Sequence, residues 1–316
     1  MATKELFSKE LHPLIEAILR LPREHLATIL ALLEQTRFHL LLERRITDHI
    51  PSANLSFERA LEDEADVLAQ RPPAELSIRV LIRLREMLGL PPYTYSSEQD
   101  FSDSAEEITT TAILHKRNVD ANFNGDSVAD LVRSQLFSLM LGLGSELDGL
   151  NKADQQHIAL IVREFIQQLP DDDKQLIFSE LGTDQLTNNT VLQALLTGEM
   201  STIFARIVNT AGFPFYSAVT YLLASIAGYL GIVLPFTTYS RLSSLIAVVS
   251  SPLFLVPQLI SSEDSLNHNW DWSVKDDMIP IIVAQLTVAG IELGSNTESG
   301  VLIKELQETW AKTMNL

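Results

Sequence analysis

The feature that most constrains this chain is a long stretch almost without charge in its C-terminal half. Residues 207–240 carry no charged side chain, and after Arg241 a second uncharged run covers residues 242–262. A helix needs about 20 apolar residues to cross the hydrocarbon core of a bilayer. Residues 213–234 reach that length and residues 243–260 nearly do. A proline and several polar residues between the two segments predict a turn, so together they form a helical hairpin with Arg241 at its tip.

Two interpretations of this hairpin stay open. Small residues recur at four-residue spacing, which lets helix backbones approach closely and favours packing in lipid. Helices that are apolar all round also suit the centre of a soluble bundle wrapped by amphipathic helices. Both hold if the hairpin is stored in a bundle and released at a membrane, as in pore-forming colicins. The candidate hairpin residues are Phe213, Tyr216, Leu222, Ala224, Gly228, Gly231, Pro235, Arg241, Ser243, Ala247 and Ser251.

The net charge of −18 limits the partners and suggests a trigger. An acidic surface repels phosphates, which argues against a nucleic-acid partner, and it repels anionic lipid headgroups at neutral pH. Protonation of Asp and Glu would weaken both this repulsion and the bundle, so we expect acid to promote insertion. The expected partners are membrane lipid or partner helices, and packing through small residues permits a homo-oligomer. Without cysteine or a signal-like start, the chain is expected in the cytoplasm, at the inner membrane if the hairpin inserts.

Helical periodicity predicts an all-α protein, a helical bundle with the hairpin late in the chain. Apolar residues recur at three- and four-residue spacing, and no strand alternation is sustained. Residues 91–112 hold acidic and small polar residues without a base, a composition typical of a linker. The expected regions are an N-terminal helical region (1–92), an acidic linker (93–117), a second helical region (118–210), the apolar hairpin (211–260) and a C-terminal helical tail (261–316).

The phrase "NFNGDSVADL" at residues 122–131 predicts a turn followed by the start of a helix. Asn124-Gly125 permits positive φ, and either Asp126 or Ser127 can cap the helix because its side-chain oxygen accepts a free amide N–H. The spacing of oxygen-bearing residues also suggests a calcium loop. Leu131 occupies the place of the bidentate glutamate, however, so a turn with a cap is the favoured interpretation.

The same phrase carries a resemblance to a known family. Its residues Phe123, Gly125, Asp126, Ser127, Val128 and Ala129 match a phrase of the type F-G-G-[DN]-[ST]-[IV]-A. With the later stretch "IVREFIQQLPDDDKQLIFSELG" and the apolar region, residues 118–260 resemble the YaaW-like family of bacterial proteins, although Asn124 replaces the first glycine of the phrase. The resemblance implies a helical protein with a late apolar region and supplies no catalytic residues.

No motif in the chain predicts an enzyme. The histidines form no HExxH pair, and there is no nucleophile elbow, P-loop or dinucleotide-binding fingerprint. Arg79, Arg83 and Arg85 alternate with apolar residues and are expected to form the polar edge of a helix. We therefore expect a non-enzymatic protein without catalytic residues, metal or cofactor, which associates with a membrane through the hairpin. The alternative is a soluble helical interaction or chaperone-like module with the hairpin as its buried core.

Overall fold

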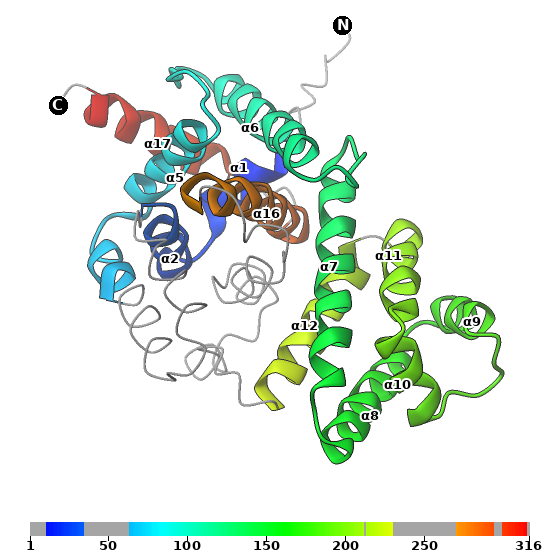
Figure 1. Cartoon of the computed structure of the whole chain (residues 1–316). Coiled ribbons are helices and arrows are strands. Elements are labelled where there is room, and N and C mark those ends of the chain that lie inside the picture. Colours follow the sequence, from blue (N-terminus) through cyan, green and yellow to red (C-terminus); the bar gives the residue numbers. More distant parts are fainter. Residues whose placement is uncertain (1–10, 35–62, 212, 230–269, 294–298, 315–316) are drawn as a thin grey trace, which may run out of the picture. The chain divides into compact units, whose positions relative to one another are not determined.

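Helices make up all the regular secondary structure in the part of the chain that the structure describes (Figure 1). The computed structural model describes residues 11–34, 63–211, 213–229, 270–293 and 299–314, and no strand occurs within these ranges. The predicted all-α class is thus confirmed. Two compact units share the described residues: unit 1 holds those up to Thr111 and from Leu286 onward, and unit 2 holds Ala112 to Gln285.

Unit 1 brings helices from both ends of the chain together. It contains α1 (Pro13–Arg20), α2 (Arg23–Glu34), α5 (Pro73–Met87), most of α6 (Glu98–Val119), the end of α16 (Trp270–Leu293) and α17 (Ser299–Met314). Helix α5 contacts α1, α2 and α17. Helix α1 begins at Pro13, which suits a first turn because it needs no N–H donor there. The ring nitrogen Nδ1 of His12 caps this turn by accepting from the Leu14 N–H at 3.1 Å.

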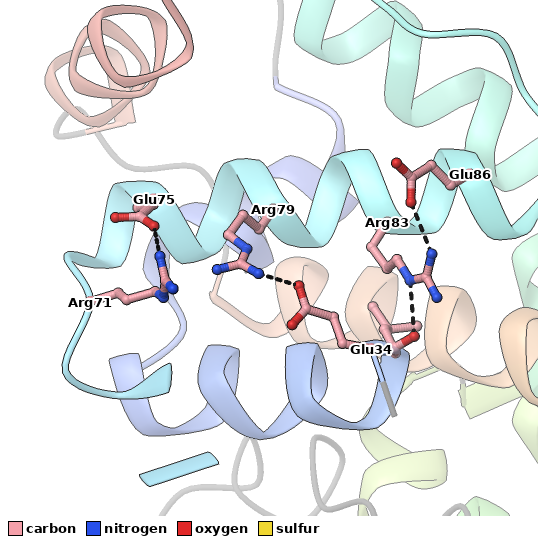
Figure 2. A network of polar contacts seen from close by, with 7 residues as sticks. Glu34, Arg71, Glu75, Arg79, Arg83 and Glu86 are labelled. Atoms are coloured by element: carbon pink, nitrogen blue, oxygen red, sulfur yellow. Dashed lines mark hydrogen bonds and ion pairs between the residues drawn. The ribbon is translucent and has the colours of Figure 1, made fainter. Parts of the chain in front are cut away.

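Arginines of α5 join it to α2, as Figure 2 shows. Arg79 Nη2 donates to Glu34 Oε1 at 2.6 Å, and Arg83 Nε donates to the carbonyl of Leu33 at 3.0 Å. Arg83 thus binds a backbone carbonyl in the last described turn of α2. Arg79 and Arg83 are half-buried between the two helices and link them directly.

The segment expected to be an acidic linker is largely a helix. Helix α6 spans Glu98–Val119, within which the boundary between the two units falls after Thr111. Most of its acids lie on the outer face, while Phe101, Ala105 and Ile108 are fully buried at helical spacing. Its start is stabilised by a reciprocal cap: the Asp100 N–H donates to Ser97 Oγ at 3.2 Å, and the Ser97 N–H donates to an Asp100 carboxylate oxygen at 2.7 Å.

The C-terminal tail belongs with the N-terminal helices. The described residues from Leu286 onward lie in unit 1, where α17 contacts α1 and α5. The Trp310 ring of α17 meets the buried Tyr95 edge-on, with centroids 5.1 Å apart. Gln307 Nε2 also donates to the Ser96 carbonyl at 3.2 Å. These contacts join residues more than two hundred positions apart, so the expected separate tail region (261–316) is not a separate unit.

Unit 2 is a bundle of six helices and the parts of α6 and α16 that extend into it, within the described residues. The six are α7 (Val128–Asp148), α8 (Lys152–Gln168), α9 (Asp171–Glu180), α10 (Asn188–Leu196), α11 (Glu199–Ala211) and α12 (Phe213–Tyr229). Helix α7 contacts α10 and α11, while α12 contacts α8 and α11. A Cβ at Gly144 of α7 would lie 2.3 Å from the carbonyl oxygen of Leu195 in α10, so only glycine permits this close crossing.

Candidate functional site: an apolar helix held by a helical bundle

The first segment of the predicted hairpin forms α12, which spans Phe213–Tyr229. This helix contains no charged residue. The remainder of that segment, the turn and the second segment (243–260) lie outside the described residues. Helix α12 is part of unit 2, together with the helices of the expected second helical region.

One face of α12 is buried in the bundle. Phe215, Val219, Leu222 and Ile226 recur at three- and four-residue spacing, and each is at most 4% exposed. Since α12 contacts α8 and α11, this face is covered by helices of the same unit. The outer side includes Ser225 and Tyr229, which are exposed. Burial therefore gives α12 an inner and an outer face, although its sequence shows little polar asymmetry.

Three phenylalanines join α12 to its neighbours. Phe215 of α12 lies edge-on to Phe204 of α11, with ring centroids 5.5 Å apart. Phe165 of α8 lies 6.0 Å from Phe204 and 6.4 Å from Phe215 by the same measure. Tilted and edge-on pairs at these distances add about 0.5–1.5 kcal/mol each to the burial of the rings. This aromatic cluster anchors the first turn of α12.

A buried polar pair lies beside the aromatic cluster. Tyr216 is fully buried, and its hydroxyl donates to Gln135 Oε1 of α7 at 3.1 Å. Gln135 is 4% exposed, and its Nε2 has no hydrogen-bond partner among the described residues. Gln135 therefore places an amide in the otherwise apolar stripe that α7 forms with Leu131, Val132 and Leu136.

A second polar contact lies at the other end of α12, at the surface. The Tyr229 hydroxyl donates to Asp154 Oδ1 of α8 at 2.7 Å. The Tyr229 ring stacks on His157, with centroids 4.1 Å apart. Because the hydrogen bond to Asp154 holds the phenolic proton, it raises the pKa of Tyr229 above its usual value. Tyr229 thus ties the last turn of α12 to α8 immediately before the uncharged chain continues.

Of the candidate hairpin residues, the structure places a subset in α12. Tyr216 and Leu222 lie on its buried face, while Phe213, Ala224 and Gly228 are helical residues whose side-chain surroundings are not described. The others lie outside the described residues: Gly231, Pro235, Arg241, Ser243, Ala247 and Ser251. Sequence reasoning missed the partners of the two tyrosines, although Gln135 carries a readable signal because it interrupts an apolar stripe.

The predicted turn and cap lie at the start of α7. Ser127, rather than Asp126, is the capping residue: its Oγ accepts from the Asp130 N–H at 3.2 Å, and its own N–H donates to Asp130 Oδ2 at 3.0 Å. The Gly125 carbonyl accepts from Arg117 Nε of α6 at 2.6 Å, and Phe123 is buried beside it. A Cβ at Gly125 would lie 2.2 Å from Cβ of Asp130, so the turn needs glycine for close approach. The predicted use of positive φ is wrong, because neither Asn124 nor Gly125 has a positive φ. Among the described residues, no group of His, Asp or Glu side chains could hold a metal ion.

Unit 1 contains a different polar cluster, centred on Arg85. This side chain is 3% exposed, so the expectation of a polar helix edge is wrong for Arg85. Its guanidinium donates to the Pro91 carbonyl through Nε and Nη2 at 3.0 and 2.9 Å, and to Ser104 Oγ through Nη1 at 3.0 Å. It also pairs with Glu107 at 2.8 Å and stacks on the Tyr93 ring at 4.6 Å. All three guanidinium nitrogens bond to groups of the same unit, so this cluster, the Arg85 staple, stabilises the fold of unit 1.

Neither the described helices nor comparison with known proteins identifies a function for this chain. None of the described helices is both long enough and apolar enough to cross a membrane. Comparison of the chain with family models, curated proteins and solved structures found no match.

Proposed function

We propose that this chain is a non-enzymatic helical protein that stores an apolar helix in a bundle and delivers it to a membrane. The observation that carries the proposal is the state of α12. A helix without a charged residue is covered on one face by α8 and α11, and the uncharged sequence continues directly beyond its last residue. In the bundle the apolar side chains of the inner face pack against aromatic and aliphatic neighbours. At a membrane the same face would be satisfied by acyl chains.

The charge of the chain makes the association conditional. With a net charge of −18, the protein is repelled by an anionic membrane surface at neutral pH. Protonation of carboxylates lowers that repulsion, so acid is the proposed trigger. The resemblance of residues 118–260 to the YaaW-like family belongs to the same proposal. It would make this a bacterial cytoplasmic protein acting at the inner membrane.

A soluble interaction or chaperone-like module is the second candidate, and the Phe165, Phe204 and Phe215 cluster favours it. Edge-on aromatic packing of this kind is typical of a permanent core. In that case α12 never leaves the bundle, and the partners would be helices of another protein or of a second copy. The two candidates differ in one measurable respect, which is whether α12 enters lipid.

Membrane fractionation of the expressed protein separates the two candidates. The membrane pellet is extracted with carbonate and then with detergent, and the fractionation is repeated at acidic pH. Protein released only by detergent supports insertion. Protein that stays soluble at both neutral and acidic pH contradicts it and supports the interaction module.

A pair of charge variants makes this test specific to α12. Ser225 is exposed in the bundle and lies near the middle of the first hairpin segment, so the side chain of Ser225→Lys can extend into solvent in the resting fold. A lysine at the centre of a membrane helix is disfavoured by about 2.5–3.5 kcal/mol, so membrane association should fall by about a hundredfold. Val301→Lys on α17 is the matched control, because Val301 is exposed and the charge change is the same. Equal association of the two variants would show that α12 does not insert.

A further inference from the structure

We propose that the Tyr216–Gln135 pair is a built-in weak point that keeps α12 releasable from the bundle. The inference rests on the proposed function, because it assigns the step that controls delivery of α12. Tyr216 is buried on α12, whose other described buried side chains are aliphatic or aromatic, and Gln135 meets it from α7.

The pair is incompletely satisfied where it is buried. The amide oxygen of Gln135 accepts the tyrosine hydroxyl at 3.1 Å, while the amide nitrogen has no partner among the described residues. At 4% exposure the Gln135 side chain has little access to bulk water. A buried donor without a partner loses its hydration and gains nothing in return, so it opposes the packed state.

Opening relieves this penalty. When α12 leaves α7, the whole amide of Gln135 becomes hydrated. The apolar neighbours Phe215, Val219 and Leu222 gain nothing from water, and they favour opening only where an apolar surface receives them. The polar pair therefore lowers the free energy of opening, while the apolar contacts direct the opened helix towards lipid.

Two other contacts made by α12 and α7 lack this arrangement. The contact at the outer end of α12, between Tyr229 and Asp154, lies at the surface, where water replaces the hydrogen bond when it breaks. The close crossing of α7 and α10 at Gly144 involves backbone against backbone and holds firmly. The buried pair is therefore the place where a conservative substitution should change the opening of α12 most selectively.

The test is a double-mutant cycle read by hydrogen exchange of the α12 amides in the full-length protein. Tyr216→Phe removes the hydroxyl and leaves the entire Gln135 amide buried without this partner, so α12 should open more often. Gln135→Met with Tyr216→Phe removes both polar groups with little change of shape. That double variant should open about fivefold less often than the wild type, since apolar replacement of both partners is neutral to stabilising.

The second readout is co-flotation with vesicles of phosphatidylethanolamine and phosphatidylglycerol at about pH 7 and about pH 5. The bound fraction should rise for Tyr216→Phe and fall for the double variant, in the same order as the exchange rates. Leu131→Met on the same stripe of α7 is the control for a volume-conserving change, and it should follow the wild type.

The outcomes are distinct. If the double variant opens as often as the wild type or more often, the pair is a stabilising or register-fixing contact and the inference is wrong. If exchange follows the expected order but vesicle binding does not, the pair does not control delivery and the inference is also wrong. If the wild type binds no vesicles at either pH, the proposed function fails, and the exchange order alone still decides whether the pair weakens the docking of α12.

Discussion

The two units differ in the chemistry that joins their helices. In unit 1 charged side chains cross from element to element: Arg79 reaches Glu34, and the buried Arg85 reaches Glu107 and the Pro91 carbonyl. In unit 2 the buried link between α12 and α7 is neutral, from Tyr216 to Gln135. Removing one partner of a buried charged link leaves an uncompensated charge or several unmet acceptors. Removing a neutral partner leaves a smaller penalty.

This difference assigns different mechanical roles to the two units. Unit 1 resists opening because Arg85 has many partners that would all have to be rehydrated together. The buried polar link described between α12 and α7 in unit 2 is a neutral hydrogen bond, and the buried face of α12 is otherwise apolar. We therefore expect unit 1 to act as the stable scaffold and α12 to be the first buried helix to open.

The largest expected effect comes from removing the Arg85 staple. Arg85→Met leaves the Pro91 carbonyl, Ser104 and Glu107 without their common donor, and breaking such a cluster costs about 3–5 kcal/mol. The lower end applies here because Glu107 is itself about half exposed. Hydrogen exchange should show faster opening of α5 and α6 with α12 unchanged.

Arg71→Met is the control for the Arg85 prediction. Arg71 lies just before α5 and pairs with Glu75 in its first turn; both side chains are partly exposed, and such pairs contribute less than about 1 kcal/mol. If Arg71→Met and Arg85→Met lost equal amounts of stability, the Arg85 cluster would not be what makes unit 1 the stable scaffold.

Alanine in place of a glycine at a helix crossing should cause the next largest loss of stability. The loss should be larger in unit 1 than in unit 2. A Cβ at Gly290 of α16 would lie 1.7 Å from the Pro13 carbonyl oxygen, closer than the 2.3 Å between a Cβ at Gly144 and the Leu195 oxygen. Overpacking of this kind costs about 1–3 kcal/mol. Gly290→Ala should therefore lower the denaturation midpoint more than Gly144→Ala. A gain in stability, which alanine gives in an unobstructed helix, would show that the crossings tolerate a methyl group.

Much of the fold was predictable from local sequence, and the failures have physical reasons. The all-α class and the cap before α7 depend on residues close to one another in the chain. The helix at 98–119 was missed because its polar composition hid the buried stripe of Phe101, Ala105 and Ile108. The Ser97 and Asp100 capping pair was the signal that could have revealed it.

The contacts that define the candidate site could not be predicted in the same way. Tyr216 and Gln135 are 81 residues apart, and local periodicity carries no information about which helix faces which. The same holds for the Trp310 and Tyr95 contact that brings the C-terminal tail to unit 1. The burial of Arg85 was missed because an arginine beside apolar residues resembles a helix edge until its acceptors are known.

A pH effect of intermediate size should distinguish the two units. Burial lowers the pKa of His12 and of His25 below 6.5, against the opposing effect of Glu106 and Glu24 respectively. The folded state therefore prefers both rings neutral. Their contribution is fully present above pH 6.5 and is lost as the pH falls through 6.5 towards the lowered pKa, by at most about 1.4 kcal/mol per pH unit for each ring.

The measurement is hydrogen exchange of both units between about pH 7 and about pH 5, corrected for intrinsic rates. Helices α1 and α2 should lose protection, and His12→Asn should reduce this loss because asparagine caps a helix without titrating. If α1 and α2 keep their protection at about pH 5, or if His12→Asn leaves the loss unchanged, burial of the histidines does not control how unit 1 responds to acid.

The smallest effect on the opening of α12 is expected at its surface contact, where Tyr229 binds Asp154. Variants of Tyr229 test whether this contact holds α12 in the bundle as strongly as the buried Tyr216–Gln135 pair does. Tyr229→Phe removes the hydrogen bond to Asp154 and keeps the ring that stacks on His157. Because Tyr229 is 41% exposed, water replaces the lost bond and α12 should open only slightly more often. Tyr229→Ala also removes the stacked ring and should have the larger effect of the two. If Tyr229→Phe instead increases the opening of α12 as much as Tyr216→Phe does, the hydrogen bond to Asp154 holds the helix in the bundle. The buried pair would then be less important than Asp154.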